Sequence, residues 1–218
     1  FFPSAGVAWR VSQEDFLKDS KTVSNLKVRT SYGITGNQEI GPYRSTPQLS
    51  TNQTALGGAA AITLLPGYLG NPDLKWERTK MLDAGLELGL FGDRVNFTAD
   101  FYIKNTSDIL LQTPIPWSAG FTTANVYKNV GSMRNTGVEL SLNTVNIKTD
   151  NFQWSTNFLF AANKNEVTKL NDGNADIFPG PNFLGENYVI REGEPIGSFY
   201  GMTRVGTYSD SPDDIAEA

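Results

Sequence analysis

Residues 82–103 read LDAGLELGLFGDRVNFTADFYI and predict two antiparallel strands joined by a short two-residue turn, Gly92-Asp93. Apolar residues fill the even positions of 82–90 and the odd positions of 95–103. Strict alternation around a glycine-containing turn is typical of a β-hairpin. Because a slip of one residue would move every leucine to the opposite face, the pattern selects a single register. That register pairs Leu90 with Val95, Leu88 with Phe97, Leu86 with Ala99, Ala84 with Phe101 and Leu82 with Ile103.

The same alternation recurs along the chain and predicts an all-β protein of about seven antiparallel, up-and-down strands. Besides the hairpin, strands are expected over residues 5–11, 26–34, 136–144, 152–162 and 196–205. The connections alternate in length, with long loops near 35–74, 105–128 and 164–192 and short turns near 92–93 and 148–151. This alternation places the long loops at one end of the sheet, as in outer-membrane barrels.

Two environments fit strands with one apolar and one polar face. A soluble β-sandwich buries its apolar faces against each other, whereas a membrane barrel turns its apolar face to lipid. The asymmetry of the connections favours the barrel, and a soluble carbohydrate-binding β-sandwich is the alternative. No apolar run approaches the roughly 20 residues of a transmembrane helix, so a membrane form of this chain would cross with strands.

The composition excludes several classes of function. The formal net charge of −5, without a basic cluster, gives no electrostatic support for nucleic-acid binding. Cysteine and histidine are absent, which removes disulfides, thiolate or imidazole metal ligands and Ser-His-Asp catalysis from these residues. We therefore expect no enzyme activity, no metal and no cofactor.

Carboxylates remain as acid–base groups, and several fall on the predicted polar face: Asp83, Glu87, Asp100 and Glu139. A glycosidase needs two carboxyl groups about 5–10 Å apart. Asp83 and Glu87 are separated by about 13 Å along a strand, and Asp100 is expected opposite Gly85, between them. We interpret these carboxylates as part of a polar wall.

Several motifs, taken in chain order, resemble the C-terminal barrel region of SusC/RagA-type TonB-dependent outer-membrane transporters. They are Phe1-Phe2-Pro3-Ser4 before Trp9-Arg10; Tyr32-Gly33 before Gly36-Asn37-Gln38; Asn71-Pro72-Asp73-Leu74-Lys75-Trp76-Glu77; Asn129-Val130-Gly131 before Arg134-Asn135 and Gly137-Val138-Glu139; and Gly193-Glu194-Pro195-Ile196-Gly197 before Tyr200-Gly201. The resemblance covers essentially the whole chain.

The resemblance implies that residues 1–218 are the C-terminal part of a transmembrane barrel of about 22 strands with a plug domain inside it. It places that barrel in the lipid bilayer of a Gram-negative outer membrane. It also implies a SusD-like surface lipoprotein as partner, import of oligosaccharides or peptides, and energy from TonB through an N-terminal region. The present residues contain no plug and no signal peptide, so we expect a fragment of a longer protein.

Aromatic residues in the long loops are the candidate ligand-binding residues, because binding residues concentrate on loops. These are Tyr68, Trp117, Phe121 and Phe178. They suit stacking on a sugar ring or packing against the capping lipoprotein. Residues 71–77 are expected to be structural, with Pro72 fixing the backbone before the strand.

One loop segment, Asp172–Asp176, resembles the start of a calcium-binding loop. That motif requires glycine at its sixth position and glutamate at its twelfth. This chain has Ile177 and Phe183 there, so we expect a solvated loop.

Overall fold

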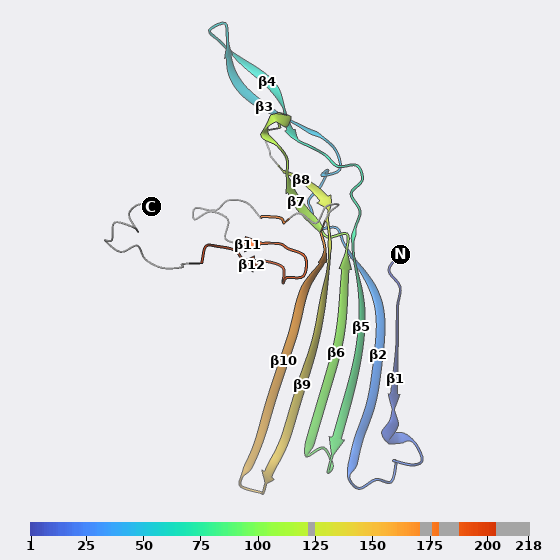
Figure 1. The fold of residues 1–218 in the computed structure, drawn as a ribbon. Coiled ribbons are helices and arrows are strands. Elements are labelled where there is room, and N and C mark those ends of the chain that lie inside the picture. Colours follow the sequence, from blue (N-terminus) through green and yellow to red (C-terminus); the bar gives the residue numbers. More distant parts are fainter. Residues whose placement is uncertain (122–124, 171–175, 179–187, 204–218) are drawn as a thin grey trace, which may run out of the picture.

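The computed structural model describes residues 1–121, 125–170, 176–178 and 188–203, and the regular secondary structure of these residues is almost entirely β. Six strands form one antiparallel sheet in the order β1-β2-β5-β6-β9-β10 (Figure 1). Their bounds are Ser4–Arg10 (β1), Val23–Asn37 (β2), Glu77–Leu90 (β5), Val95–Ser107 (β6), Ser132–Lys148 (β9) and Gln153–Lys169 (β10). Each strand pairs with its successor in this order, so the sheet is an up-and-down meander, which confirms the predicted fold class.

Three two-stranded sheets project from one end of the main sheet, the end at which the long connections lie (Figure 1). They are β3 (Gln48–Leu56) with β4 (Ala59–Tyr68), β7 (Leu110–Pro114) with β8 (Asn125–Asn129), and β11 (Tyr188–Val189) with β12 (Ser198–Phe199). Short 3-10 turns occur at η1 (Val11–Gln13) and η2 (Trp117–Ala119). In the described part of the chain, no helix combines the length and hydropathy needed to cross a membrane.

The predicted register of the central hairpin is confirmed at every apolar pair of β5 and β6, from Leu90–Val95 to Leu82–Ile103. The turn itself is longer than predicted, because Phe91–Arg94 separate the two strands. Phe91, Gly92 and Asp93 all have positive φ angles, of 57°, 64° and 62°. The side-chain amide of Asn96 closes this turn by donating a hydrogen bond to the Asp93 carbonyl at 2.7 Å.

The register extends the apolar alternation across the whole sheet. One row runs through five neighbouring strands: Leu26, Leu88, Phe97, Leu142 and Phe158. We call the surface made by this row and its parallel neighbours the apolar face, and the opposite surface the polar face. None of these five residues is buried, and Phe158 is 57% exposed. Within the described residues, therefore, no second layer covers the apolar face, contrary to a sandwich.

The structure corrects the predicted extent of several elements. Strand β10 continues to Lys169, beyond the predicted end at residue 162, and β9 begins at Ser132. The predicted loops 35–74 and 105–128 contain the hairpins β3–β4 and β7–β8.

The prediction of a seventh strand over residues 196–205 is wrong for the described residues. Only Ser198–Phe199 forms a strand there, and it pairs with Tyr188–Val189, outside the main sheet. Gly193 and Gly197 have φ angles of 84° and 76°, which turn the chain on either side of Pro195. Residues 204–205 lie outside the described part of the chain.

A small hydrophobic core sits where the main sheet meets the loops. It consists of Val130, Val167, Leu170, Ile177 and Ile190, with Leu111 packed against it. The segment that carries Gly193 is attached to this core, because the Gly193 amide donates to the Val167 carbonyl at 2.8 Å. The described chain thus buries apolar side chains mainly where the long loops leave the main sheet, a region around these core residues that we call the loop base.

Gly131 provides a test of how tightly this base is packed. Its φ angle is +84°, and a Cβ atom there would lie 2.5 Å from the Lys169 carbonyl oxygen. We expect Gly131→Ala to cost about 2–4 kcal/mol, from left-handed backbone strain plus the clash with β10. Gly92→Ala is the control, since Gly92 has φ +64° but no atom within 4 Å, and should cost about 1 kcal/mol. Denaturant unfolding of the full-length variants in detergent measures both, and equal losses would contradict the packing argument.

Candidate functional site

Ion pairs connect three strands on the polar face. The Arg29 guanidinium on β2 contacts Asp83 on β5 at 2.9 Å and also pairs with Asp100 on β6. Gly85 lies beneath this group, and a Cβ there would approach the Arg29 Nε atom to 2.7 Å. The glycine therefore leaves the room in which the guanidinium lies across the sheet.

A second pair extends this network. The Lys27 ammonium contacts Glu87 at 3.0 Å, and Arg29 lies 3.7 Å from the same carboxylate. Glu139 is exposed and makes no hydrogen bond or ion pair with a described residue. Three of the four predicted polar-face carboxylates are thus engaged with cations, an arrangement that supports the interpretation of a polar wall.

The segment 71–77 is fixed by side-chain amides from β8 and its own turn. The Asn129 side chain accepts the Lys75 N–H at 2.8 Å and donates to the Lys75 carbonyl at 2.7 Å, as a neighbouring strand would. Its amide also donates to the Asp108 carbonyl at 2.8 Å. Asn71 donates to the Tyr127 carbonyl at 2.9 Å. These bonds confirm that the segment has a structural role.

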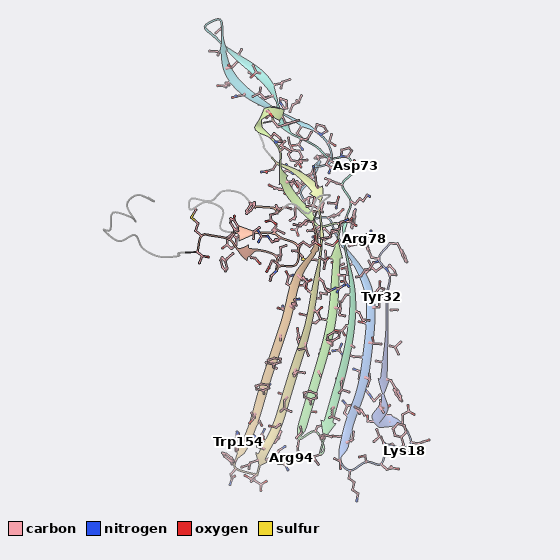
Figure 2. All side chains as sticks on the ribbon, viewed as in Figure 1. Lys18, Tyr32, Asp73, Arg78, Arg94 and Trp154 are labelled. Atoms are coloured by element: carbon pink, nitrogen blue, oxygen red, sulfur yellow. The ribbon has the colours of Figure 1, made fainter. Side chains whose placement is uncertain are left out.

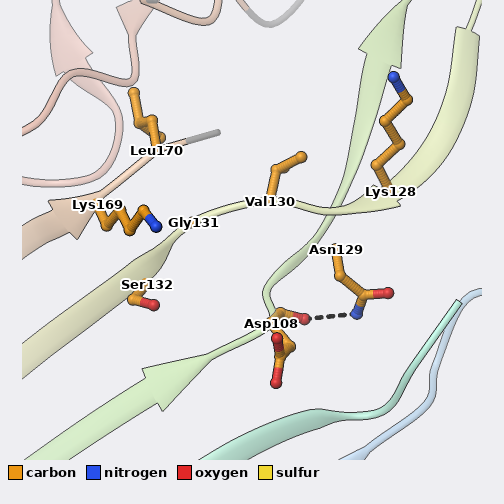
Figure 3. Close-up of a pocket in the computed structure, with 8 residues that line it drawn as sticks. All are labelled: Asp108, Lys128, Asn129, Val130, Gly131, Ser132, Lys169 and Leu170. Atoms are coloured by element: carbon orange, nitrogen blue, oxygen red, sulfur yellow. Dashed lines mark hydrogen bonds between the residues drawn. The ribbon is translucent and has the colours of Figure 1, made fainter. Parts of the chain in front are cut away.

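Figure 3 shows an open pocket of about 480 Å³ between the end of β10 and the β8–β9 connection. Lys128 and Lys169 contribute cationic side chains, and Asp108 contributes a carboxylate. The Asp108 carboxylate is already paired with Arg78 at 3.2 Å, and Asn129 bonds backbone groups. The pocket is therefore a hydrophilic depression whose acidic and amide groups serve the loop base.

The predicted aromatic residues occupy different environments. Tyr68 is buried, with 5% of its surface exposed, and its hydroxyl accepts the Tyr127 N–H at 3.1 Å. Phe121 is half-buried, and so is Phe178, whose ring packs edge-on against Tyr200 at 5.1 Å. Trp117 begins η2, but its side chain is outside the described part of the structure. No ring-to-ring contact joins the three described members of this group.

Sequence reasoning missed Arg44, which lies over the Tyr68 ring at 4.8 Å and the Tyr127 ring at 5.8 Å. Cation–π contacts of this kind hold a guanidinium against aromatic faces. The sequence does contain one feature that singles out Arg44: this residue directly precedes a long segment, 45–70, that contains no charged residue.

The segment 172–176, for which we expect a solvated loop, lies largely outside the described residues, which include only Asp176 of its five positions. The Asp176 carboxylate forms a fork with Arg191, with contacts of 3.1 Å from Nε and 2.6 Å from the terminal nitrogen. Next to this pair, Ile177 and Ile190 exchange backbone hydrogen bonds of 3.0 and 2.9 Å. Hydrogen bonding from Arg191 lowers the pKa of Asp176, aided by the guanidinium charge and opposed by desolvation.

This shift predicts a pH dependence of the local structure. Because the folded-state pKa lies below the ordinary value of 3.8, the ion pair stabilises fully above that value and loses its effect as the pH falls through the folded pKa. We expect the Ile177 and Ile190 amides to exchange hydrogen faster in acid, after correction for intrinsic rates. Asp176→Asn should accelerate this exchange at neutral pH and abolish the acid response, and an unchanged response in that variant would contradict the assignment.

Comparison with known proteins gives the family. Residues 1–212 match the family model described as TonB dependent receptor-like, beta-barrel. The TonB-dependent receptor P3 of Formosa agariphila is 40% identical over 212 residues, covering 95% of this chain and 21% of that protein. The TonB-dependent receptor SusC of Bacteroides thetaiotaomicron is 37% identical over 177 residues, covering 79% of this chain and 17% of that protein.

Solved structures agree with this result. The RagAB peptide importer in its closed-closed state superimposes with a TM-score of 0.78 at 33% identity, covering 91% of this chain and 21% of that one. Its open-open state gives 0.75 at 34% identity. The chain thus spans about a fifth of the length of the relatives it matches. The matches confirm the resemblance seen in the sequence, and the chain belongs to the TonB-dependent receptor family as a part of its β-barrel.

Proposed function

We propose that this chain forms part of the wall of an outer-membrane importer, with its apolar face toward lipid and its polar face toward the lumen. The observation that carries this proposal is the uncovered apolar face. Val7 is 71% exposed, and Phe160 is 46% exposed, although both occupy rows of apolar side chains. Water would penalise such a surface, whereas hydrocarbon would not.

The dimensions of the apolar face support the same orientation. From Leu82 to Leu90 the strand advances about 26 Å, comparable with the roughly 25 Å apolar band of outer-membrane barrels. Trp154 lies at the short-turn end of the sheet, and Tyr32 lies toward the loop end (Figure 2). Amphipathic aromatic rings at both borders suit the two membrane–water interfaces.

The projecting hairpins and loops would then face the outside of the cell. In this orientation they are placed to meet the solute and a SusD-like surface lipoprotein. The relatives named TonB-dependent receptors and the RagAB peptide importer support import driven through TonB. We propose a peptide or an oligosaccharide as the imported solute. The similarity to the RagAB peptide importer supports a peptide, and the resemblance to SusC/RagA-type transporters implies either class.

The wall of an importer has to present polar groups to a passing solute, and the polar face does so. Its carboxylates Asp83, Glu87 and Asp100 are paired with cations of β2. Because these three groups are engaged in ion pairs, they do not form the unpartnered acid and base pair that a glycosidase uses. We therefore propose transport in preference to catalysis.

The orientation is tested by placing one arginine on either face of the full-length protein at similar depth. Leu86→Arg puts a charge on the apolar face at the centre of the 82–90 stretch and should cost about 2–4 kcal/mol near the bilayer midplane. Thr98→Arg is the matched control on the polar face, where its β5 neighbour is Glu87, and should be tolerated.

Folding into liposomes and uptake of labelled peptides and oligosaccharides are the two measurements. We expect Leu86→Arg to impair assembly and uptake, and Thr98→Arg to retain both. Equal tolerance on both faces would refute the orientation. Normal assembly of the wild-type protein without uptake of either solute would refute the proposed import.

A further inference from the structure

Two cations at the loop base, Arg44 and Lys75, have no acidic partner among the described residues. The Arg44 side chain makes no hydrogen bond or ion pair with any residue that the structure describes, and the same holds for the Lys75 ammonium. By contrast, Arg78 at the start of β5 is paired with Asp108.

Arg44 is nevertheless held in place. Its guanidinium carbon lies 4.8 Å from the Tyr68 ring centre and 5.8 Å from that of Tyr127. The Tyr68 ring is itself fixed, because it is buried and its hydroxyl accepts a backbone hydrogen bond from Tyr127. The Nε atom of Arg44 is buried without an acceptor. The fold therefore positions this cation without neutralising it.

Both cations line one pocket of about 230 Å³, at the point where β2 ends and β5 begins. Gln38, Ser45 and Trp76 also line it, and none of its lining residues is acidic. The carboxylate of Glu77, next in the chain after Trp76, is occupied elsewhere: it accepts hydrogen bonds from the Leu110 amide and the Asn37 side chain. The pocket thus combines two positive charges, polar side chains and an indole.

We propose that this pocket binds a carboxylate group of the imported solute, an inference that rests on the proposed import function. The planar guanidinium of Arg44 matches a carboxylate in a two-point contact, and Lys75 adds a point charge. The carboxylate can belong to an acidic peptide or to a uronic acid in an oligosaccharide. In both cases the pocket would favour acidic solutes over their neutral analogues.

The site is first tested without transport, on the full-length protein in detergent. Saturation-transfer NMR with glutarate, a dicarboxylate, should detect binding, whereas the neutral diamide glutaramide should give no signal. Arg44→Gln should weaken glutarate binding about tenfold, as expected for loss of one charge-assisted contact. Arg10→Gln is the control, because Arg10 is an exposed arginine at the opposite end of the sheet and forms no ion pair with a described residue. Equal glutarate signals in the wild type and Arg44→Gln, or no glutarate signal in either, would overturn the proposal.

Solute selectivity is the second measurement. Affinities are compared for a glutamate-containing peptide and its glutamine analogue, and for an oligogalacturonate and its methyl ester. In the solute class that the protein binds, Arg44→Gln should weaken the affinity for the acidic member about tenfold and leave the affinity for the neutral member unchanged. Arg44→Lys should recover part of the preference and shows whether the position tolerates change. Equal weakening of both members would refute a carboxylate site, whereas glutarate binding without uptake of any solute would refute the import function alone.

Discussion

The structure depends on one hydrogen-bonded register shared by six antiparallel strands. In that register Val28, Leu86, Ala99, Leu140 and Phe160 lie side by side on the apolar face. The adjacent row on the other face contains Arg29, Gly85 and Asp100. A slip of one residue between any two strands would mix these rows and place charges among apolar side chains. The register thus separates apolar from polar side chains, as a packed interior does in a globular domain.

The sequence predicts this part of the fold well because the information is local. Period-two alternation needs no knowledge of distant residues, and a short turn fixes which strands pair. The register of β5 and β6 was therefore predictable residue by residue. The turn at Phe91–Arg94 was not, because it places Phe91 in a left-handed conformation that non-glycine residues seldom adopt.

The hairpins β3–β4 and β7–β8 were missed because their sequences lack that alternation. Ala59, Ala60 and Ala61 are consecutive in β4, and Leu64 and Leu65 are adjacent, so apolar residues fall on both faces and no alternation results. Ile62 and Leu64 are 75% and 65% exposed, which shows that no burial requirement shaped the pattern. In the predicted strand 196–205, by contrast, β-forming residues are present, but Gly197, with a φ angle of 76°, turns the chain near its start.

The loop base could not be predicted because its contacts join residues far apart in the chain. Arg44 and Tyr68 come from the connection between β2 and β5, and Tyr127 comes from the connection between β6 and β9. Only the folded sheet brings these two connections to one end. The side chain of Asn129 likewise makes, with the Lys75 backbone, the hydrogen bonds that a neighbouring strand would make, although the two residues are 54 positions apart in the chain. Motifs in the sequence indicated that these segments matter without indicating their partners.

These two levels of organisation divide the work of the molecule. The rows of the main sheet are repetitive, so they can define an environment, apolar on one side and polar on the other, but they distinguish few solutes. The loop base is irregular, and side chains there are fixed by specific bonds, such as the backbone hydrogen bond to the Tyr68 hydroxyl. A cation held over that ring with no ion pair to a described carboxylate differs from Arg29, whose charge is balanced within the wall. In the proposed importer, selectivity would therefore belong to the loops, and the sheet would supply the rigid frame that makes their geometry reproducible.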